Sequence, residues 1–140
     1  MGSRRKSREY ALQLLFRSEF SDPEDSEELI WGSKEVDSET RDFAQFLHDR
    51  YVENEARIDR LIQKYARNWK LERMATVDRN ILRMAIAEFL FAETPRVVVI
   101  DEAIEVARKY SGEEATEFVN GILDAIRKDL EDAGKGQSSG

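Results

Sequence analysis

The stretch "VDRNILRMAIAEFLFA" (residues 77–92) decides the fold class, because its apolar residues cover most of the circumference of a helix. A surface helix carries an apolar stripe, whereas a helix that is apolar nearly all round is buried among other elements. Thr76 is a candidate N-cap for this helix, and Glu93-Thr94-Pro95 ends it. The sequence therefore predicts a helix at the centre of a bundle.

Apolar residues spaced three and four positions apart predict further helices on both sides of this one. We expect an all-α protein of about seven helices without a sheet. Residues 21–37 are acidic and weakly periodic, which predicts a loop with one or two helical turns, anchored by Leu29, Ile30 and Trp31. Ser38 is a candidate N-cap after this loop. The other helical patterns lie at residues 4–20, 43–51, 58–69, 97–111 and 115–130, with a short turn at 71–74.

Three positions in the C-terminal half need a separate interpretation. Residues 97–100 are β-branched and would also suit a buried strand, but their spacing continues into a helical pattern and Pro95 suits a helix start. We therefore predict a helix there, ended by Gly112. Gly121 falls in the middle of the last helical pattern, and we expect it to permit the close approach of another helix.

Composition excludes several classes of protein. The chain has 140 residues, no cysteine, one histidine and a formal net charge of −7. A chain of this length forms one domain, and the absence of cysteine removes disulfides and thiolate sites. No apolar run approaches the roughly 20 residues of a membrane span, and no signal sequence opens the chain. We expect a cytoplasmic protein that contacts no membrane.

No pattern typical of an active site is present. Acidic clusters at residues 101–105 and 113–117 lack accompanying histidine, cysteine or a glycine-rich phosphate loop, so solvated helix faces explain them best. His48 lies between two core positions without a nucleophile nearby in the sequence. We therefore predict a binding protein rather than an enzyme, with no metal and no cofactor.

The most informative feature is the distribution of charge. Residues 1–20 carry five basic and two acidic side chains, whereas residues 21–40 carry one basic and eight acidic side chains. On a helix over residues 4–20, the face opposite the apolar arc carries Lys6, Gln13 and Arg17, and the rings of Tyr10 and Phe16 flank it. Cations, amides and stacking rings together are typical of single-stranded RNA recognition. The alternatives are a solubilising tail for the cations and a core edge for Phe16.

Four stretches resemble, in order and spacing, the motifs of the NusB family of bacterial transcription antitermination factors: "RRKSREYALQLLF" (4–16), "RNILRMAIAE" (79–88), "VIDEAIEVARKYS" (99–111) and "FVNGIL" (118–123). The resemblance covers about residues 4–130. It implies two small three-helix bundles packed together, at about residues 4–70 and 74–130, without enzymatic activity. Residues 1–3 and 131–140 would be flexible tails.

The resemblance also implies a function. Proteins of this family bind the boxA element of nascent transcripts as a heterodimer with NusE, a ribosomal small-subunit protein, and promote processive transcription of ribosomal RNA operons by RNA polymerase. By position, the implied RNA-binding residues are Arg4, Arg5, Lys6, Arg8, Gln13 and Phe16, with Arg79 and Arg83 as a possible extension or, equally, as structural ion pairs. The implied partner-binding residues are Glu88, Glu114 and Phe118.

The chain departs from the family pattern at two of these places. Phe16 stands where relatives often have tyrosine, which would preserve stacking and remove a phenolic hydrogen bond, and Ala87 stands where an aromatic residue is common. Two other functions remain open: a helical protein-protein interaction module without RNA binding, and an accessory domain of an RNA methyltransferase, for which the chain has no methyl-donor domain. The sequence also leaves open a homodimer that hides the RNA surface.

Overall fold

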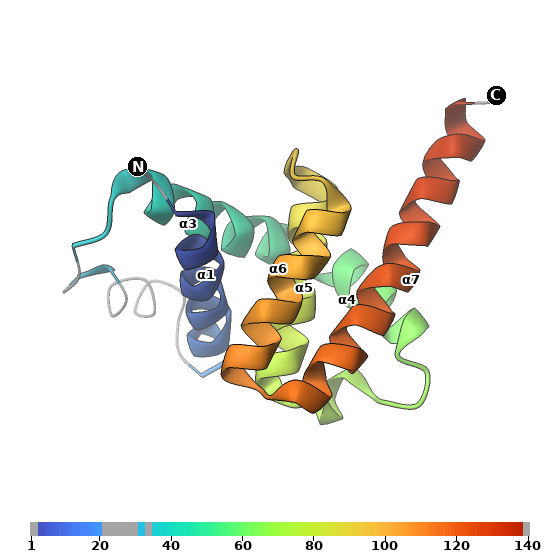
Figure 1. Ribbon diagram of the computed structural model, residues 1–140, viewed down its shortest axis with the longest axis horizontal. Helices are drawn as coiled ribbons and strands as arrows, with labels where there is room; N and C mark the ends of the chain where they lie inside the picture. Colours follow the sequence, from blue (N-terminus) through green and yellow to red (C-terminus); the bar gives the residue numbers. More distant parts are fainter. Residues whose placement is uncertain (1–2, 21–30, 33–34, 139–140) are drawn as a thin grey trace.

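The computed structural model describes residues 3–20, 31–32 and 35–138, and those residues form helices and connecting turns without a strand. Figure 1 shows α1 against α3 on one side of the molecule, with α5 and α6 between α1 and the long helix α7. The six α-helices and one 3₁₀ helix in these ranges are α1 (Arg4–Ser18), α3 (Ser38–Glu53), α4 (Glu55–Tyr65), η1 (Leu71–Arg73), α5 (Thr76–Phe91), α6 (Arg96–Tyr110) and α7 (Glu113–Ser138).

Helix α5 is the centre of the fold, as its sequence predicts. Residues 80–89 are all buried, and α5 packs against α1, α3, α4, α6 and α7. The all-α prediction is therefore confirmed. Helices α5, α6 and α7 pack against one another, while α4 packs against α5 and α7 as well as α3. The division into bundles at about residues 4–70 and 74–130 stays a prediction.

Helix starts fall within one residue of the predicted caps. Asp37, not Ser38, is the N-cap of α3, and its carboxylate accepts a hydrogen bond of 3.0 Å from the backbone N–H of Thr40. Thr76 is the first residue of α5, after an N-cap at Ala75 that makes no side-chain bond. Residues 97–100 lie in α6, which confirms the helical interpretation.

The two singled-out glycines have different environments. Gly112 has a φ of +131° and its N–H donates to the carbonyl of Ala107, so it ends α6 as predicted. Gly121 does not mediate close packing, because a Cβ built there meets nothing within 4 Å. The prediction for Gly121 is therefore wrong, since the residue lies on the exposed side of α7.

The cap of α1 and the end of α7 lie in the two segments that were expected to be tails. Ser3 caps α1, and its backbone N–H donates to the hydroxyl of Thr40 at 2.9 Å. Helix α7 continues to Ser138, and an i,i+4 ion pair of 2.9 Å between Arg127 and Glu131 supports its continuation past residue 130. Residues 1–2 and 139–140 lie outside the described residues, and the flexibility of residues 1–3 and 131–140 stays a prediction.

Trp31, one of the three expected anchors before α3, contacts two other side chains. Its indole N–H donates to the side chain of Gln45 at 3.1 Å, and its ring packs against Tyr10 with centroids 5.2 Å apart. Leu29 and Ile30, the other two expected anchors, lie outside the described residues. None of the described helices is long and apolar enough to cross a bilayer.

Candidate nucleic-acid interface

Helix α1 places its basic residues at the surface by burying its apolar arc. Ala11, Leu14 and Leu15 are buried against α3 and α5, while Arg4, Arg5 and Lys6 are exposed in the first turn. That turn contains no acidic residue. The positive end of the helix dipole lies at this turn, so the three cations there destabilise the helix slightly. The cations and the dipole together create a positive potential that attracts anions.

The three exposed cations differ in how free they are. The Arg5 guanidinium makes two hydrogen bonds of 3.2 Å to the Glu102 carboxylate, and these bonds raise the pKa of Arg5. Arg4 and Lys6 form no ion pair with any described residue. Arg4 instead lies over the ring of Phe43, with its guanidinium carbon 3.8 Å from the ring centroid. Arg4 and Lys6 are therefore available to phosphates, and Arg5 is partly neutralised.

Arg8 is not part of this surface. It is 4% exposed, and its Nε and Nη2 donate to the two oxygens of Glu88 at 2.8 and 2.6 Å. Glu88 is 1% exposed. The pair therefore corrects two expectations together, because Arg8 cannot reach RNA and Glu88 cannot touch a partner without unfolding the contact between α1 and α5. The sequence did indicate that Arg8 is buried, because Arg8, Leu12 and Leu15 are spaced i, i+4, i+7 and therefore lie on one side of the helix.

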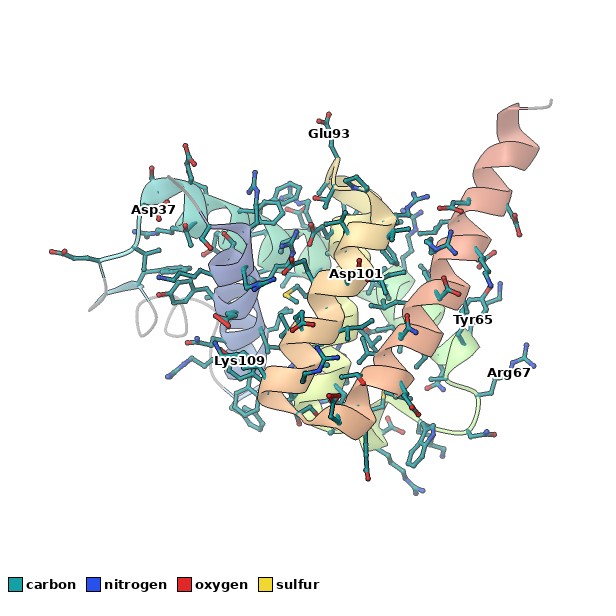
Figure 2. The ribbon with its side chains drawn as sticks, viewed as in Figure 1. Asp37, Tyr65, Arg67, Glu93, Asp101 and Lys109 are labelled. Carbon is teal, nitrogen blue, oxygen red and sulfur yellow. The ribbon has the colours of Figure 1, made fainter. Side chains whose placement is uncertain are left out.

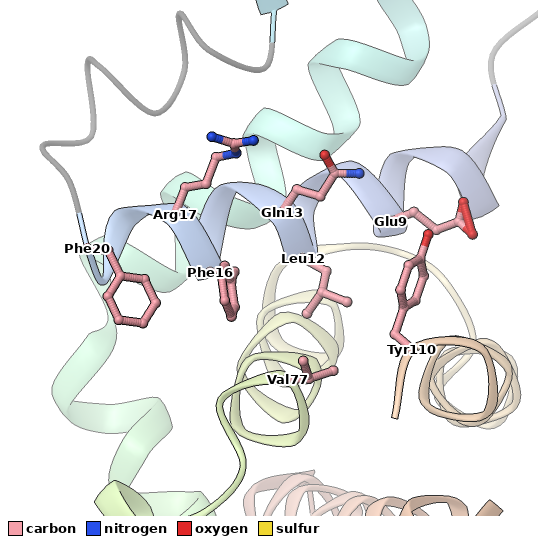
Figure 3. Close-up of a pocket in the computed structure, with 8 residues that line it drawn as sticks. All are labelled: Glu9, Leu12, Gln13, Phe16, Arg17, Phe20, Val77 and Tyr110. Carbon is pink, nitrogen blue, oxygen red and sulfur yellow. The ribbon is translucent and has the colours of Figure 1, made fainter. Parts of the chain in front are cut away.

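A groove of about 500 Å³ follows the exposed side of α1 toward its C-terminal end. Figure 3 shows Phe16 of α1 beside Phe20, which lies in the turn after the helix, with Gln13 and Arg17 on α1. The two rings are 41% and 69% exposed, and their centroids lie 5.2 Å apart. Tyr110 of α6 lines the other end. The sequence predicted Gln13 and Phe16 but missed Phe20, although it lies four residues after Phe16.

Arg79 and Arg83 of α5 are committed to ion pairs. Both donate to Glu19, at 2.7 and 2.9 Å, and Arg83 also makes two bonds of 3.0 Å to Asp59. The Tyr51 hydroxyl donates to the same Asp59 carboxylate, and burial raises the pKa of Tyr51 above its usual range. Of the two sequence interpretations, the structural ion pair is the one that the geometry supports, so these arginines do not extend the basic surface.

A second groove contains the other two expected partner-binding residues. Glu114 and Phe118 line a cavity of about 380 Å³ together with Trp69, Met74 and Asp78. Phe118 is partly buried against the core, whereas Trp69 is 57% exposed. An exposed tryptophan beside an apolar hollow with a carboxylate rim is typical of a protein-binding surface.

Three carboxylates of the acidic clusters at residues 101–105 and 113–117 form ion pairs. Glu102 pairs with Arg5, while Glu105 and Glu113 both pair with Arg108. His48 is buried, with its Nδ1 2.9 Å from Asp49. Within the described ranges, no three acidic or histidine side chains come together as a metal site would require.

Comparison with known proteins places the chain in a family. The model described as the NusB family matches residues 5–128. The transcription antitermination protein NusB of Koribacter versatilis is 45% identical over 134 residues, which cover 93% of this chain and 92% of that protein. The corresponding protein of Salinibacter ruber is 41% identical, covering all of this chain and 90% of its own length.

Solved structures of NusB proteins have the same fold as this chain. NusB of T. maritima superposes with a TM-score of 0.83 at 41% identity, covering 91% of this chain and 93% of that one. A chain from a crystal structure of antitermination factors NusB and NusE in complex with dsRNA gives a TM-score of 0.81 at 28% identity, covering 90% and 96%. The protein described here therefore belongs to the NusB family of transcription antitermination factors.

Proposed function

We propose that this protein binds single-stranded boxA-type RNA as a heterodimer with NusE and promotes processive transcription of ribosomal RNA operons by RNA polymerase. The observation that carries the proposal is the exposed face of α1, where unpaired cations precede an amide and two exposed rings. The protein acts in the cytoplasm as a binding factor without enzymatic activity. The crystal structure of NusB and NusE in complex with dsRNA describes a relative and supports NusE and an RNA as partners here, while the preference for a single strand rests on the exposed rings.

The α1 face consists of Arg4, Lys6, Gln13, Phe16 and Arg17 of α1 together with Phe20 in the turn after it. Each of these groups has a distinct role. Arg4, Lys6 and Arg17 neutralise phosphates, which supplies affinity without sequence preference. Gln13 bonds base edges, and Phe16 and Phe20 stack bases. Because stacking rings are accessible only to unpaired bases, this face favours a single strand over a duplex. Arg5 joins the phosphate contacts when it exchanges Glu102 for RNA.

The groove at Trp69, Glu114 and Phe118 is the proposed NusE surface. Its apolar hollow accepts side chains of the partner, and its lining holds the carboxylates of Glu114 and Asp78 beside the cation of Arg73. A ribosomal protein is basic, and a chain with net charge −7 attracts it while avoiding nonspecific contact with nucleic acid. The cations at the start of α1 and the carboxylates of this groove thus place the RNA-binding surface and the NusE-binding surface at different sites.

A gel shift with a short boxA-type RNA, with and without NusE, tests the proposal. We expect weak RNA binding alone and tight, selective binding with NusE. Trp69→Ala should weaken the heterodimer with little loss of stability, because its side chain is exposed. Absence of RNA binding in both conditions, with NusE still bound, would instead favour a protein-protein interaction module. Size-exclusion chromatography of the free protein tests whether it is a homodimer.

A further inference from the structure

A row of two stacked rings with a cation at each end leads away from the start of α1 and across α3. The Arg4 guanidinium lies 3.8 Å from the centroid of the Phe43 ring, and Phe43 stacks with Phe46 at 6.0 Å and an interplanar angle of 18°. The guanidinium of Arg50 lies 5.3 Å from the centroid of the Phe46 ring. The four side chains thus form one row.

The row borders a groove of about 330 Å³ between α3 and the turn that joins α5 to α6. Arg4, Phe43 and Phe46 line one side, and Ala92, Glu93 and Thr94 line the other. Figure 2 places Glu93 at the tip of that turn. The volume lies at the small end of ligand pockets. Phe43 and Phe46 are partly buried against the core, and their exposed parts offer apolar contact without hydrogen-bonding groups. Such a site suits a flat ring better than a large ligand.

We propose that this groove holds a nucleobase of the same RNA strand, stacked against the Arg4 guanidinium and in contact with the Phe46 ring. Arg4 is common to the α1 face and the groove, so a strand that binds one is led directly into the other. Phe43 beneath Arg4 fixes the guanidinium plane, and guanidinium planes stack bases as rings do. The inference rests on the proposed function, because its occupant is the same RNA.

Charge sets the orientation of the nucleotide in the groove. Arg4 forms no ion pair with a described residue, whereas Arg50 is held by Glu53 at 2.6 Å. Glu93 is the carboxylate in the groove lining. It repels phosphate and accepts hydrogen bonds from exocyclic amino groups. The phosphate therefore faces Arg4, and the edge of the base faces Glu93.

The length of RNA needed to reach the groove follows from the helix. Phe16 and Arg4 are 12 residues apart on α1, which is about 18 Å along the axis at about 1.5 Å per residue. At about 3.4 Å per stacked nucleotide, a strand anchored at Phe16 spans this distance with about five nucleotides. A shorter RNA binds the α1 groove alone.

The test compares a core boxA-type RNA with nested extensions at its 5′ and 3′ ends, with NusE present. In the wild type, one series should gain about five- to hundredfold in affinity once the extension reaches the groove, as one stacked base provides. Phe46→Leu should abolish that gain and leave the core RNA unaffected, while Phe46→Tyr, which keeps the ring, should retain it. Arg57→Gln removes an exposed positive charge on α4 and serves as the charge control.

Melting temperatures measured in parallel show whether each variant is folded. If the core RNA binds but no extension adds affinity, or if Phe46→Leu keeps the full gain, the inference is wrong and the proposed function stands. If Phe46→Leu weakens NusE binding instead, the groove is a protein contact and the inference is likewise overturned. If the core RNA does not bind at all, the proposed function fails and the inference fails with it.

Discussion

Two arginine-containing regions of the molecule, the first turn of α1 and the middle of α5, have opposite environments. Arg4 in the first turn is exposed and forms no ion pair with a described residue, whereas Arg83 of α5 is buried between Asp59 and Glu19. Arg8 lies only one turn after Arg4, yet it belongs with the second group because Glu88 binds it inside the fold. The local count of basic residues therefore overstates the surface that RNA can meet.

The comparison separates a stability role from a binding role for the same type of side chain. A buried guanidinium that pairs with a buried carboxylate matters for stability, because removing only one partner leaves an uncompensated buried charge. An exposed guanidinium contributes little to stability and is free for a phosphate. The substitutions below test whether the two groups are as distinct as the structure indicates.

Arg8→Ala should have the largest effect. It leaves the Glu88 carboxylate buried without its two hydrogen bonds, and we expect a loss of about 3–5 kcal/mol in the free energy of unfolding. Urea denaturation measures this loss. The double variant with Arg8→Met and Glu88→Leu removes both charges and should recover most of the stability. A loss below about 1 kcal/mol in Arg8→Ala would place Arg8 with the exposed arginines.

Arg83→Met should have an intermediate effect of the same kind. Asp59 keeps its bond from Tyr51 but loses two bonds from Arg83, and Glu19 keeps Arg79. We expect a loss of about 1–3 kcal/mol in stability. The RNA affinity of the folded protein should not change. A weakened RNA complex at unchanged stability would show that Arg83 contacts RNA after all.

The fold was largely predictable from the sequence because its main signals are local. Residues 77–92 predicted a central helix, and Gly112 predicted a helix end, since spacing and backbone freedom determine both. The environment of Arg8 was harder to predict, because its partner lies 80 residues away in the chain. Only its position on the apolar arc with Leu12 and Leu15 indicated burial. Gly121 was misjudged because spacing along a helix does not specify which helix faces it.

Phe16→Ala extends the comparison from cations to rings. Because the side chain is 41% exposed, stability should fall by less than the roughly 3–5 kcal/mol of a core phenylalanine. RNA affinity should fall by about 1–3 kcal/mol if a base stacks there, with little change in its salt dependence. Isothermal titration calorimetry with NusE present, at two salt concentrations, measures the RNA affinity and its salt dependence, and urea denaturation measures the stability. A large loss of stability with normal RNA affinity would make Phe16 a core residue.

The combined Arg4→Ala and Lys6→Ala variant should have the smallest effect on free energy and the clearest salt signature. Both side chains are exposed and free of ion pairs with described residues, so the melting temperature should barely change. Each phosphate contact on a single strand contributes about −0.7 to the slope of log affinity against log salt. Losing two contacts should therefore make the slope less steep by about 1.4. Between 50 and 200 mM salt, the wild type should lose about sevenfold more affinity than the variant.

Arg5→Ala provides the matched comparison for that variant, because Arg5 is exposed in the same turn but already bound to Glu102. Its slope should change by less than about 0.7, since breaking the pair with Glu102 offsets part of a phosphate contact. Equal slopes for the wild type and the combined Arg4→Ala and Lys6→Ala variant would mean that the unpaired cations do not contact RNA. The α1 face would then be a solvated surface, and exposure alone would not distinguish the binding arginines from the others.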